Sequence, residues 1–307
     1  MRAPIHRPVL VREVVVALAV RPRGRYIDCT VGEGGHTQAI LESTSPAPSV
    51  LGLDLDEDSL ATARRRLEKH LDNVTLVRGS YTDVERLAAA HNFTGADGIL
   101  FDLGLSSAQL ETPQRGFSFA SEGPLDMRFD QAQAQTAHRL VNQATERDLA
   151  DIIYRLGEEH RSRRIARAIV SARPIETTTR LAEVVAAALG GVRGRIHPAT
   201  QTFQALRMAV NSELEAIGSG MEQAVRVVGG GGRIVVVSYH SLEDRLVKGF
   251  MRRESMNCLC GPDAPPCTCG HTATIRILTK KVIKPTEQET GENPRSRSAK
   301  LRVAEKL

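Results

Sequence analysis

Short apolar runs alternate with helical patterns in the first third of the 307-residue chain. Each run has the length of a buried strand and is bounded by polar or glycine-rich residues, whereas the segments between the runs carry apolar residues at helical spacing. Alternating strands and helices of this kind build parallel sheets. We therefore predict an α/β fold with βαβαβ units over about residues 24–107, whose strands begin near Tyr26, Val50, Val74 and Gly98.

The alternation then stops, since residues 131–225 show helical periodicity and almost no strand signal. Strand residues return at 232–237, a helical pattern follows at 242–252, and two late runs at 274–278 and 299–303 suit an antiparallel hairpin. This order predicts one discontinuous domain with an all-helical insertion. We place the α/β domain at residues 1–110 and 226–307, and the insertion at residues 111–225.

A glycine-rich turn follows the first predicted strand. Gly32 and Gly34 fit a dinucleotide fingerprint, but its last glycine position holds Thr37. Asp28 lies inside the strand, where a carboxylate is unfavourable beside a pyrophosphate and useful beside an ammonium group. S-adenosylmethionine has an ammonium and no phosphate, so the pattern favours a methyltransferase over an NAD oxidoreductase. A tight turn without a ligand remains the alternative.

Acidic or aromatic residues follow three further strands. Asp54 lies 20 residues after Gly34, where an acid commonly accepts ribose hydroxyls, whereas helix capping explains Asp56 and Asp58. Tyr81 is a candidate for packing on an adenine ring or a half-buried structural residue. Asp102 either accepts a hydrogen bond from an exocyclic amine and so raises its electron density, or contacts the cofactor, or is structural.

The strand at 232–237 is followed by a second group of candidate residues. Tyr239 could stack on a base turned out of its helix. His240 invites a general-base role, although a methylated amine is acidic enough to lose its proton to water. Ser241 is predicted to cap the next helix, with Asp244 in the capping-box position.

The composition and net charge of the chain indicate which class of partner it binds. Apolar residues make up 41% and charged residues 25% of the chain, as in soluble globular proteins, and the net charge of +5 favours nucleic acid as a partner over a merely basic enzyme. No apolar run is long enough to span a bilayer, and the odd count of five cysteines without a secretion signal predicts a cytoplasmic protein. Four basic runs could contact phosphates: residues 161–167, 193–197, 280–284 and 295–302.

Four of the cysteines lie close together, in two C-x-C pairs separated by six residues. Four thiolates can bind zinc, but one intervening residue strains a shared tetrahedron, since zinc ligand pairs usually have at least two. The alternative is a reduced, thiol-rich loop, and we assign no metal ligands from the sequence. The residues concerned are Cys258, Cys260, Cys267 and Cys269.

Together, the motifs of nearly the whole chain resemble the RsmH (MraW) methyltransferases, and so many ordered matches are more specific than a glycine-rich loop. The main matching segments are Asp28–His36, Phe101–Leu110, Arg115–Phe119, Gly123–Arg128, Ser238–Arg245 and Asn293–Arg302. The resemblance implies a class I (Rossmann-like) methyltransferase sheet, with an inserted helical substrate-binding domain at residues 111–225 that helps to hold the RNA. It also implies transfer of a methyl group from S-adenosyl-L-methionine to the N4 of a cytidine in the decoding region of 16S ribosomal RNA. The cofactor pocket it implies comprises Gly34, Gly35, His36, Asp54, Tyr81, Asp102 and Gln109.

Within this resemblance we expect two catalytic residues. Asp102 would orient the amine, and Tyr239 or a phenylalanine of residues 115–119 would pack on the base. Val31 and Tyr81 each occupy a position where the family commonly has Phe, and neither difference changes this expectation. Two rival functions remain: a methyltransferase for amines of DNA or protein, and a non-enzymatic RNA-binding factor of ribosome assembly. The sequence leaves the oligomeric state open.

Overall fold

The computed structural model of the chain describes residues 8–192, 197–260 and 268–307. These residues form two compact units. The first, here called the sheet unit, extends up to Gly104 and resumes at Leu214, and the second, the helical unit, is Leu105–Glu213. Each unit has its own hydrophobic core, so each is described separately.

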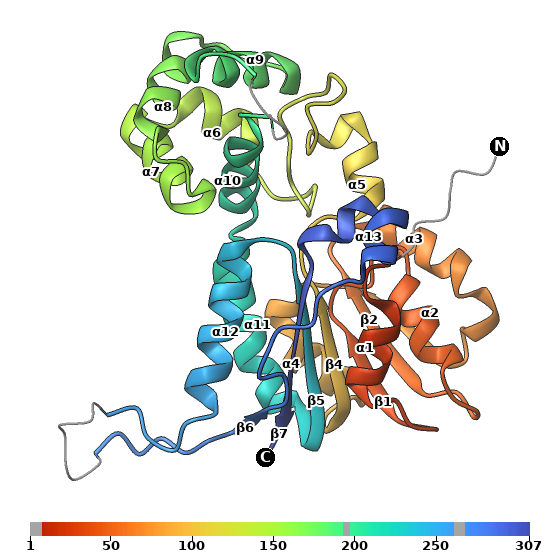
Figure 1. The fold of residues 1–307 in the computed structure, drawn as a ribbon. Helices are drawn as coiled ribbons and strands as arrows, with labels where there is room; N and C mark the ends of the chain where they lie inside the picture. Colours follow the sequence, from red (N-terminus) through yellow and green to blue (C-terminus); the bar gives the residue numbers. More distant parts are fainter. Residues whose placement is uncertain (1–7, 193–196, 261–267) are drawn as a thin grey trace. The chain divides into compact units, whose positions relative to one another are not determined.

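The sheet unit contains one seven-stranded sheet in the order β3-β2-β1-β4-β5-β7-β6 (Figure 1). Strands β1 to β5 are parallel, and β7 lies antiparallel between β5 and β6, as the two late apolar runs predicted. The strands are β1 (Arg25–Asp28), β2 (Ser49–Asp54), β3 (Val74–Arg78), β4 (Ala96–Asp102), β5 (Val228–Ser238), β6 (Ile275–Ile277) and β7 (Lys300–Lys306).

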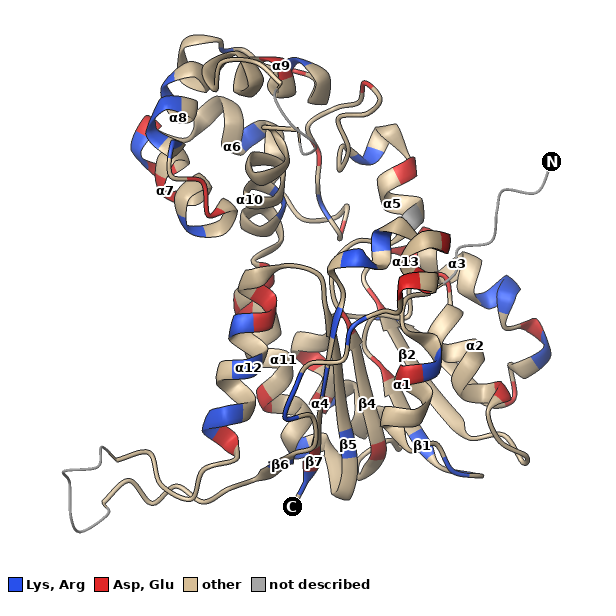
Figure 2. Cartoon of the chain, in the orientation of Figure 1, with Lys and Arg blue, Asp and Glu red and all other residues tan. Residues whose placement is uncertain are grey.

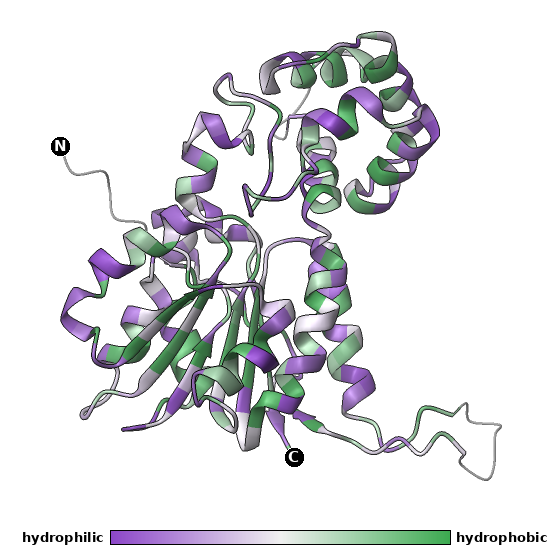
Figure 3. Cartoon of the chain, turned by 180° about the vertical axis from the view of Figure 1, so that it is seen from behind, coloured by the Kyte–Doolittle hydropathy of each residue, from purple (hydrophilic) through white to green (hydrophobic). Residues whose placement is uncertain are grey.

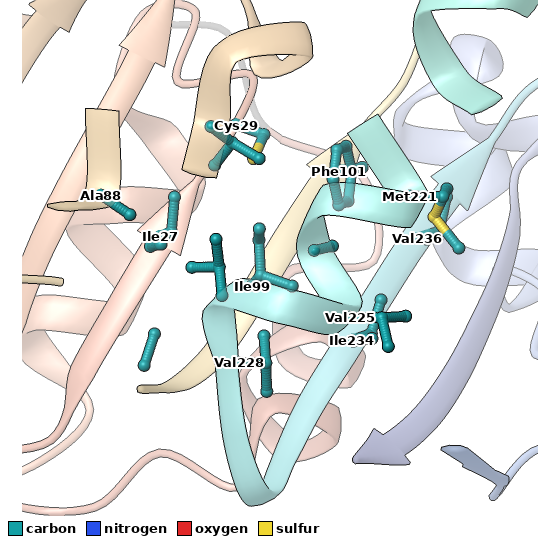
Figure 4. Close-up of a cluster of buried hydrophobic side chains, with 14 of the residues drawn as sticks. Ile27, Cys29, Ala88, Ile99, Phe101, Met221, Val225, Val228, Ile234 and Val236 are labelled. Atoms are coloured by element: carbon teal, nitrogen blue, oxygen red, sulfur yellow. The ribbon is translucent and has the colours of Figure 1, made fainter. Parts of the chain in front are cut away.

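Helices cover both faces of this sheet because its strands are apolar on both sides, as parallel strands usually are. In β4, Ile99 and Phe101 face one core while Leu100 faces the other. Figure 4 shows the first of these cores, and Figure 3 shows the apolar strands of the sheet. Helices α4 (Val84–Ala90), α11 (Glu213–Val227) and α12 (Ser241–Glu254) pack on the first face, and α1 (Val11–Leu18), α2 (Gly35–Glu42) and α3 (Glu57–Arg66) on the second.

The helical unit buries the apolar sides of amphipathic helices in a core of its own. In α8, for example, Ile165 and Ile169 are buried whereas Arg163, Arg164 and Arg167 are exposed. The helices are α5 (Ser107–Glu111), α6 (Ala137–Gln143), α7 (Glu146–Gly157), α8 (Ser162–Ser171), α9 (Thr178–Ala188) and α10 (Thr200–Asn211).

The unit boundaries differ from those that we placed at 110/111 and 225/226. Within the stretch of helical periodicity at residues 131–225, the helix breaks at Ser212, whose φ of 46° is left-handed. The chain then enters α11, and Ile217, Met221 and Ala224 of that helix are buried in the core of the sheet unit. Helical periodicity alone cannot tell which core a helix joins, and for this reason the sequence assigned α11 to the insertion.

None of the helices in the described part of the chain has both the length and the apolar character needed to span a membrane.

Candidate active site

Three acidic side chains end three adjacent strands of the sheet. Asp28 ends β1, Asp54 ends β2 and Asp102 ends β4. Ligands of open α/β sheets bind beyond the carboxyl ends of the strands, near the point where the strand order reverses. Here that point lies between β1 and β4, because the chain proceeds outwards from β1 through β2 to β3 and then returns to β4. The three acids therefore surround the place where this fold binds ligands.

The glycine-rich loop takes conformations that other residues avoid. Gly32 and Gly34 have φ values of 50° and 82°, and Gly34 is the N-cap residue of α2. A Cβ atom on Gly34 would lie 3.2 Å from Leu67 Cδ1, and one on Gly35 would lie 2.6 Å from Pro8 Cγ. Glycine is thus required both by backbone conformation and by close packing.

Asp54 joins this loop to the end of β2. Its two carboxylate oxygens accept hydrogen bonds from the backbone N–H groups of Gly32, at 2.8 Å, and Asp56, at 2.9 Å. Burial raises the pKa of Asp54 to about 6, although these two hydrogen bonds oppose the shift. The side chain is still partly exposed, so its remaining lone pairs can accept hydroxyl groups of a ligand. Asp56 caps α3, as predicted.

Asp102 lies between a histidine and a tyrosine. Its Oδ1 accepts a 2.7 Å hydrogen bond from the hydroxyl of Tyr239, and its Oδ2 lies 3.4 Å from His36 Nδ1. His36 Nε2 lies 2.9 Å from the backbone carbonyl of Val9. A carbonyl can only accept a hydrogen bond, so Nε2 carries a hydrogen. This hydrogen bond to Val9 orients the imidazole ring with Nδ1 towards Asp102.

Burial works against the ionised form of Asp102, whereas two of its neighbours favour that form. Burial raises the pKa of Asp102, and His36 and the hydrogen bond from Tyr239 oppose that shift. The pKa of Tyr239 is raised well above its usual value by burial and then by Asp102, so the phenol stays neutral and donates. The pair is thus a carboxylate positioned by a fixed hydroxyl donor.

Two threonines, which sequence reasoning missed, support these acids. Thr37 Oγ1 donates to Asp28 Oδ2 at 2.7 Å, and the backbone N–H of Asp102 donates to Thr30 Oγ1 at 2.7 Å. Asp28 Oδ1 also accepts from the backbone N–H of Thr30, at 3.2 Å. Thr37 was noted only because it occupies the last position of the dinucleotide fingerprint. A hydroxyl there bonds a buried carboxylate, which a glycine could not do.

The remaining predicted cofactor residues have different surroundings. Tyr81 is half-buried, and its ring packs edge-on against Phe101, with ring centroids 5.6 Å apart. Gln109 belongs to the helical unit, where it forms a capping box with Ser106 at the start of α5. The roles of Tyr81 and Gln109 in cofactor binding therefore stay predictions.

The aromatic residues proposed to pack on the base already make other contacts within the protein. Phe117 is buried and stacks on Phe129 in the core of the helical unit. Phe119 is half-buried against Phe203 of the same unit. The hydroxyl of Tyr239 binds Asp102, so Tyr239 acts on that carboxylate whether or not its ring also contacts a base.

The start of α12 differs from its prediction. His240, and not Ser241, is the N-cap residue, because its Nδ1 accepts a 3.3 Å hydrogen bond from the backbone N–H of Glu243. Glu243 completes the capping box. Asp244 instead binds Lys300 and Arg302 of β7, at 3.2 and 2.7 Å. A histidine cap is unusual, so the sequence favoured the serine beside it.

The basic runs divide into structural and exposed groups, and Figure 2 marks the positions of Lys and Arg along the chain in blue. Lys300 and Arg302 are ion-paired with Asp244, whereas Arg295 and Arg297 are exposed. In α8, Arg163 and Arg164 point away from the core of the helical unit. Most of the run at 193–197 lies outside the described residues, except His197.

Comparison with known proteins identifies the family. The model of the MraW methylase family matches residues 3–307. A protein of Thermomicrobium roseum named "Ribosomal RNA small subunit methyltransferase H" is 50% identical over 305 residues, which cover 98% of this chain and 94% of that protein. Proteins of the same name from Dehalococcoides mccartyi and Geobacter sulfurreducens are 48% and 47% identical, and the matches cover 86% and 99% of them.

Among solved structures, an rRNA methylase from Streptococcus thermophilus aligns with 99% of this chain and 99% of its own, at 11% identity and a TM-score of 0.43. The strand order, with β7 antiparallel, and the family match together confirm the predicted α/β fold with a class I methyltransferase sheet. The chain belongs to the MraW methylase family.

Proposed function

We propose that this chain transfers a methyl group from S-adenosyl-L-methionine to the exocyclic N4 of a cytidine in the decoding region of 16S ribosomal RNA, within the small ribosomal subunit. The observation that carries the proposal is the family match across residues 3–307, with relatives that are named for methylation of small-subunit ribosomal RNA. The choice of an exocyclic amine rests on Asp102, a hydrogen-bonded carboxylate at the end of β4.

The residues at the strand ends fit S-adenosyl-L-methionine. Asp54 would accept the two ribose hydroxyls, because burial and only two backbone donors leave its carboxylate short of hydrogen bonds. The loop at Gly34 and Gly35 lets the backbone approach the ligand without side chains. Asp28 and Asp102 supply negative charge for an ammonium group. When bound, S-adenosyl-L-methionine supplies an electrophilic methyl group on a sulfonium.

The residues around Asp102 suit activation of a weak amine. The lone pair of a cytosine N4 is delocalised into the ring, so a carboxylate that accepts one of its N–H bonds raises its electron density. Tyr239 would hold Asp102 in the acceptor orientation, and the other carboxylate oxygen lies 3.4 Å from His36 Nδ1. The nitrogen would form the new N–C bond as the bond between the methyl group and the sulfonium sulfur breaks, which leaves a neutral thioether. The nitrogen would then lose one proton, which water can accept. Proximity and orientation would supply most of the remaining rate enhancement.

Exposed arginines would bind RNA phosphates. Arg163 and Arg164 on α8, and Arg295 and Arg297 near the C-terminus, are exposed to solvent. A contact between an arginine and a phosphate does not depend on the RNA sequence, and it weakens as the salt concentration rises. Lys300 and Arg302 are left out of this set, because Asp244 already binds both.

Methyl transfer from labelled S-adenosyl-L-methionine to small ribosomal subunits that lack the modification tests the proposal, with nucleoside analysis of the product. Wild-type protein should form N4-methylcytidine. Asp102→Asn should abolish transfer, whereas Asp97→Asn, on the same strand at its opposite end, should keep it. Tyr239→Phe removes one hydrogen bond to a charged acceptor, worth about 1.5–3 kcal/mol, and should slow single-turnover transfer by about 10- to 100-fold.

Three results would contradict parts of this proposal. Label in another nucleoside would overturn the substrate and keep the fold. Transfer to DNA or protein in preference to RNA would favour another amino-methyltransferase. RNA binding without cofactor binding or transfer would support a non-enzymatic assembly factor.

A further inference from the structure

A long connection between α12 and β6 carries four of the five cysteines. We call its described residues, 255–260 and 268–274, the cysteine arm, which Figure 1 shows extending away from the sheet. Its two sides are joined at the base, where the backbone N–H of Thr274 donates to the carbonyl of Glu254 at 2.8 Å. A second link joins the backbone N–H of Ala273 to Asn257 Oδ1 at 3.3 Å.

The cysteine arm has no hydrophobic core of its own. None of its described residues is buried, and Met256 and Leu259 are 39% and 43% exposed. Small segments that cannot bury apolar surface are usually ordered by a disulfide or a metal ion. The arm is therefore a segment in which a metal ion would replace a missing core.

Three sulfur atoms meet where the two sides of the arm run together. The Sγ atoms of Cys258, Cys260 and Cys269 all lie within 4.8 Å of one another. Those of Cys258 and Cys269 are 3.8 Å apart. Zinc–sulfur bonds of about 2.3 Å in a tetrahedron place neighbouring sulfurs about 3.8 Å apart. The sulfurs of Cys258 and Cys269 thus already have the spacing of zinc ligands, and the sulfur of Cys260 lies within 4.8 Å of both.

Backbone N–H groups point at the same sulfurs. Cys258 Sγ accepts from the N–H of Cys260 at 3.3 Å, and Cys269 Sγ accepts from the N–H of Leu259 at 3.3 Å. Cys260 Sγ accepts from the N–H groups of Thr268 and Cys269. Hydrogen bonds of this kind orient metal ligands. All three sulfurs therefore accept backbone hydrogen bonds and lie close to one another.

We propose that Cys258, Cys260 and Cys269 bind one zinc ion, which fastens the two sides of the cysteine arm. Three thiolates select a soft or borderline ion, and zinc is the one that structural thiolate sites usually hold. A water molecule or a further side chain completes the tetrahedron. Cys267 lies outside the described residues and is not part of the proposed site. This site is separate from the acids at the strand ends, and its role is structural.

Metal analysis of the purified full-length chain tests the site. The chain is produced with a tag that binds no metal, without chelators, and its metals are measured by inductively coupled plasma mass spectrometry. We expect about one zinc per wild-type chain and less than about 0.1 in Cys258→Ser and Cys269→Ser. Cys29→Ser is the matched control, because Cys29 is a buried thiol of the sheet core, and it should keep its zinc.

Two further measurements report on the site independently of enzyme activity. Exchange of the metal for cobalt should give thiolate-to-cobalt charge-transfer bands in wild type and Cys29→Ser, and not in Cys258→Ser. Trypsin should cleave the arm at least about tenfold faster in Cys258→Ser. The main thermal unfolding transition of that variant should change little, because the arm contributes no buried residue, and this shows that the variant is folded.

The proposal is overturned if wild-type chain remains without zinc after incubation with zinc salt under reducing conditions. It is also overturned if the arm variants retain as much zinc as Cys29→Ser, or if the metal found is iron or copper. Loss of zinc from Cys29→Ser together with the arm variants would likewise contradict it.

Discussion

Lowering the pH through 6 should weaken binding of S-adenosyl-L-methionine, because Asp54 must be ionised to accept both ribose hydroxyls. Burial raises the pKa of Asp54 from 3.8 to about 6. The protonated form therefore dominates in the free protein at pH 5, where an exposed aspartate is still charged. The ligand binds the ionised form, so its affinity should rise with pH and level off above pH 7.

The size of the effect follows from the ionised fraction. For a pKa of about 6, about 0.99 of the Asp54 side chains are ionised at pH 8 and about 0.09 at pH 5. When only the ionised fraction is competent, the apparent dissociation constant rises by the reciprocal of that fraction. The affinity should thus fall about tenfold between pH 8 and pH 5, which is about 1.4 kcal/mol.

Isothermal titration calorimetry between pH 5 and 8 measures this change, with a melting curve at each pH to show that the protein stays folded. Asp54→Asn should bind more weakly at pH 8 and lose the pH dependence centred near 6. Burial also raises the pKa values of Asp28 and Asp102. Asp102→Asn is therefore the control, and it should keep the dependence that Asp54 causes. An affinity of the wild type that stays constant from pH 8 to pH 5 would refute the reasoning.

Two further predictions concern stability. Gly34→Ala should destabilise the protein by about 1–2 kcal/mol in urea titrations and weaken cofactor binding. The reason is that φ is 82° and that the new Cβ would lie 3.2 Å from Leu67. An unchanged midpoint of urea unfolding would contradict this prediction. Asp244→Asn should cost about 1–3 kcal/mol at pH 7. Burial opposes ionisation of Asp244, but hydrogen bonds from Arg302 and Lys300 outweigh it and lower the pKa. That stability is present above the pKa of an unfolded aspartate and is lost as the pH falls through the lowered value, so the variant and the wild type should converge in acid.

The features that the sequence predicted correctly are those set by short-range spacing. The run from Tyr26 to Gly35 predicts a strand, a turn and a helix, and the structure has β1, the glycine loop and α2 there. Asp54 and Asp102 follow apolar runs directly, so their positions at strand ends can be predicted without a structure. The antiparallel pair β6 and β7 follows from composition in the same way.

Contacts between distant residues could not be predicted. Tyr239 and Asp102 are 137 positions apart, and only the parallel pairing of β4 with β5 brings their ends together. The contact of His36 with Val9 depends likewise on how the N-terminal segment lies over the loop. The cap at His240 was missed because a local rule favoured Ser241. In the first two cases tertiary packing chose among options that the sequence left equal.

The acids at the strand ends make the free site electrostatically unfavourable. Burial raises the pKa of each, and the charge of Asp102 raises that of Asp28, whose charge in turn raises that of Asp54. Thr30 and Thr37 offset only part of this cost. A ligand with an ammonium group, a sulfonium and two ribose hydroxyls would supply the positive charge and the donors that the cluster lacks. The same repulsion that destabilises the free protein would therefore strengthen binding of such a ligand, because the bound positive charge would remove that repulsion and stabilise the folded state.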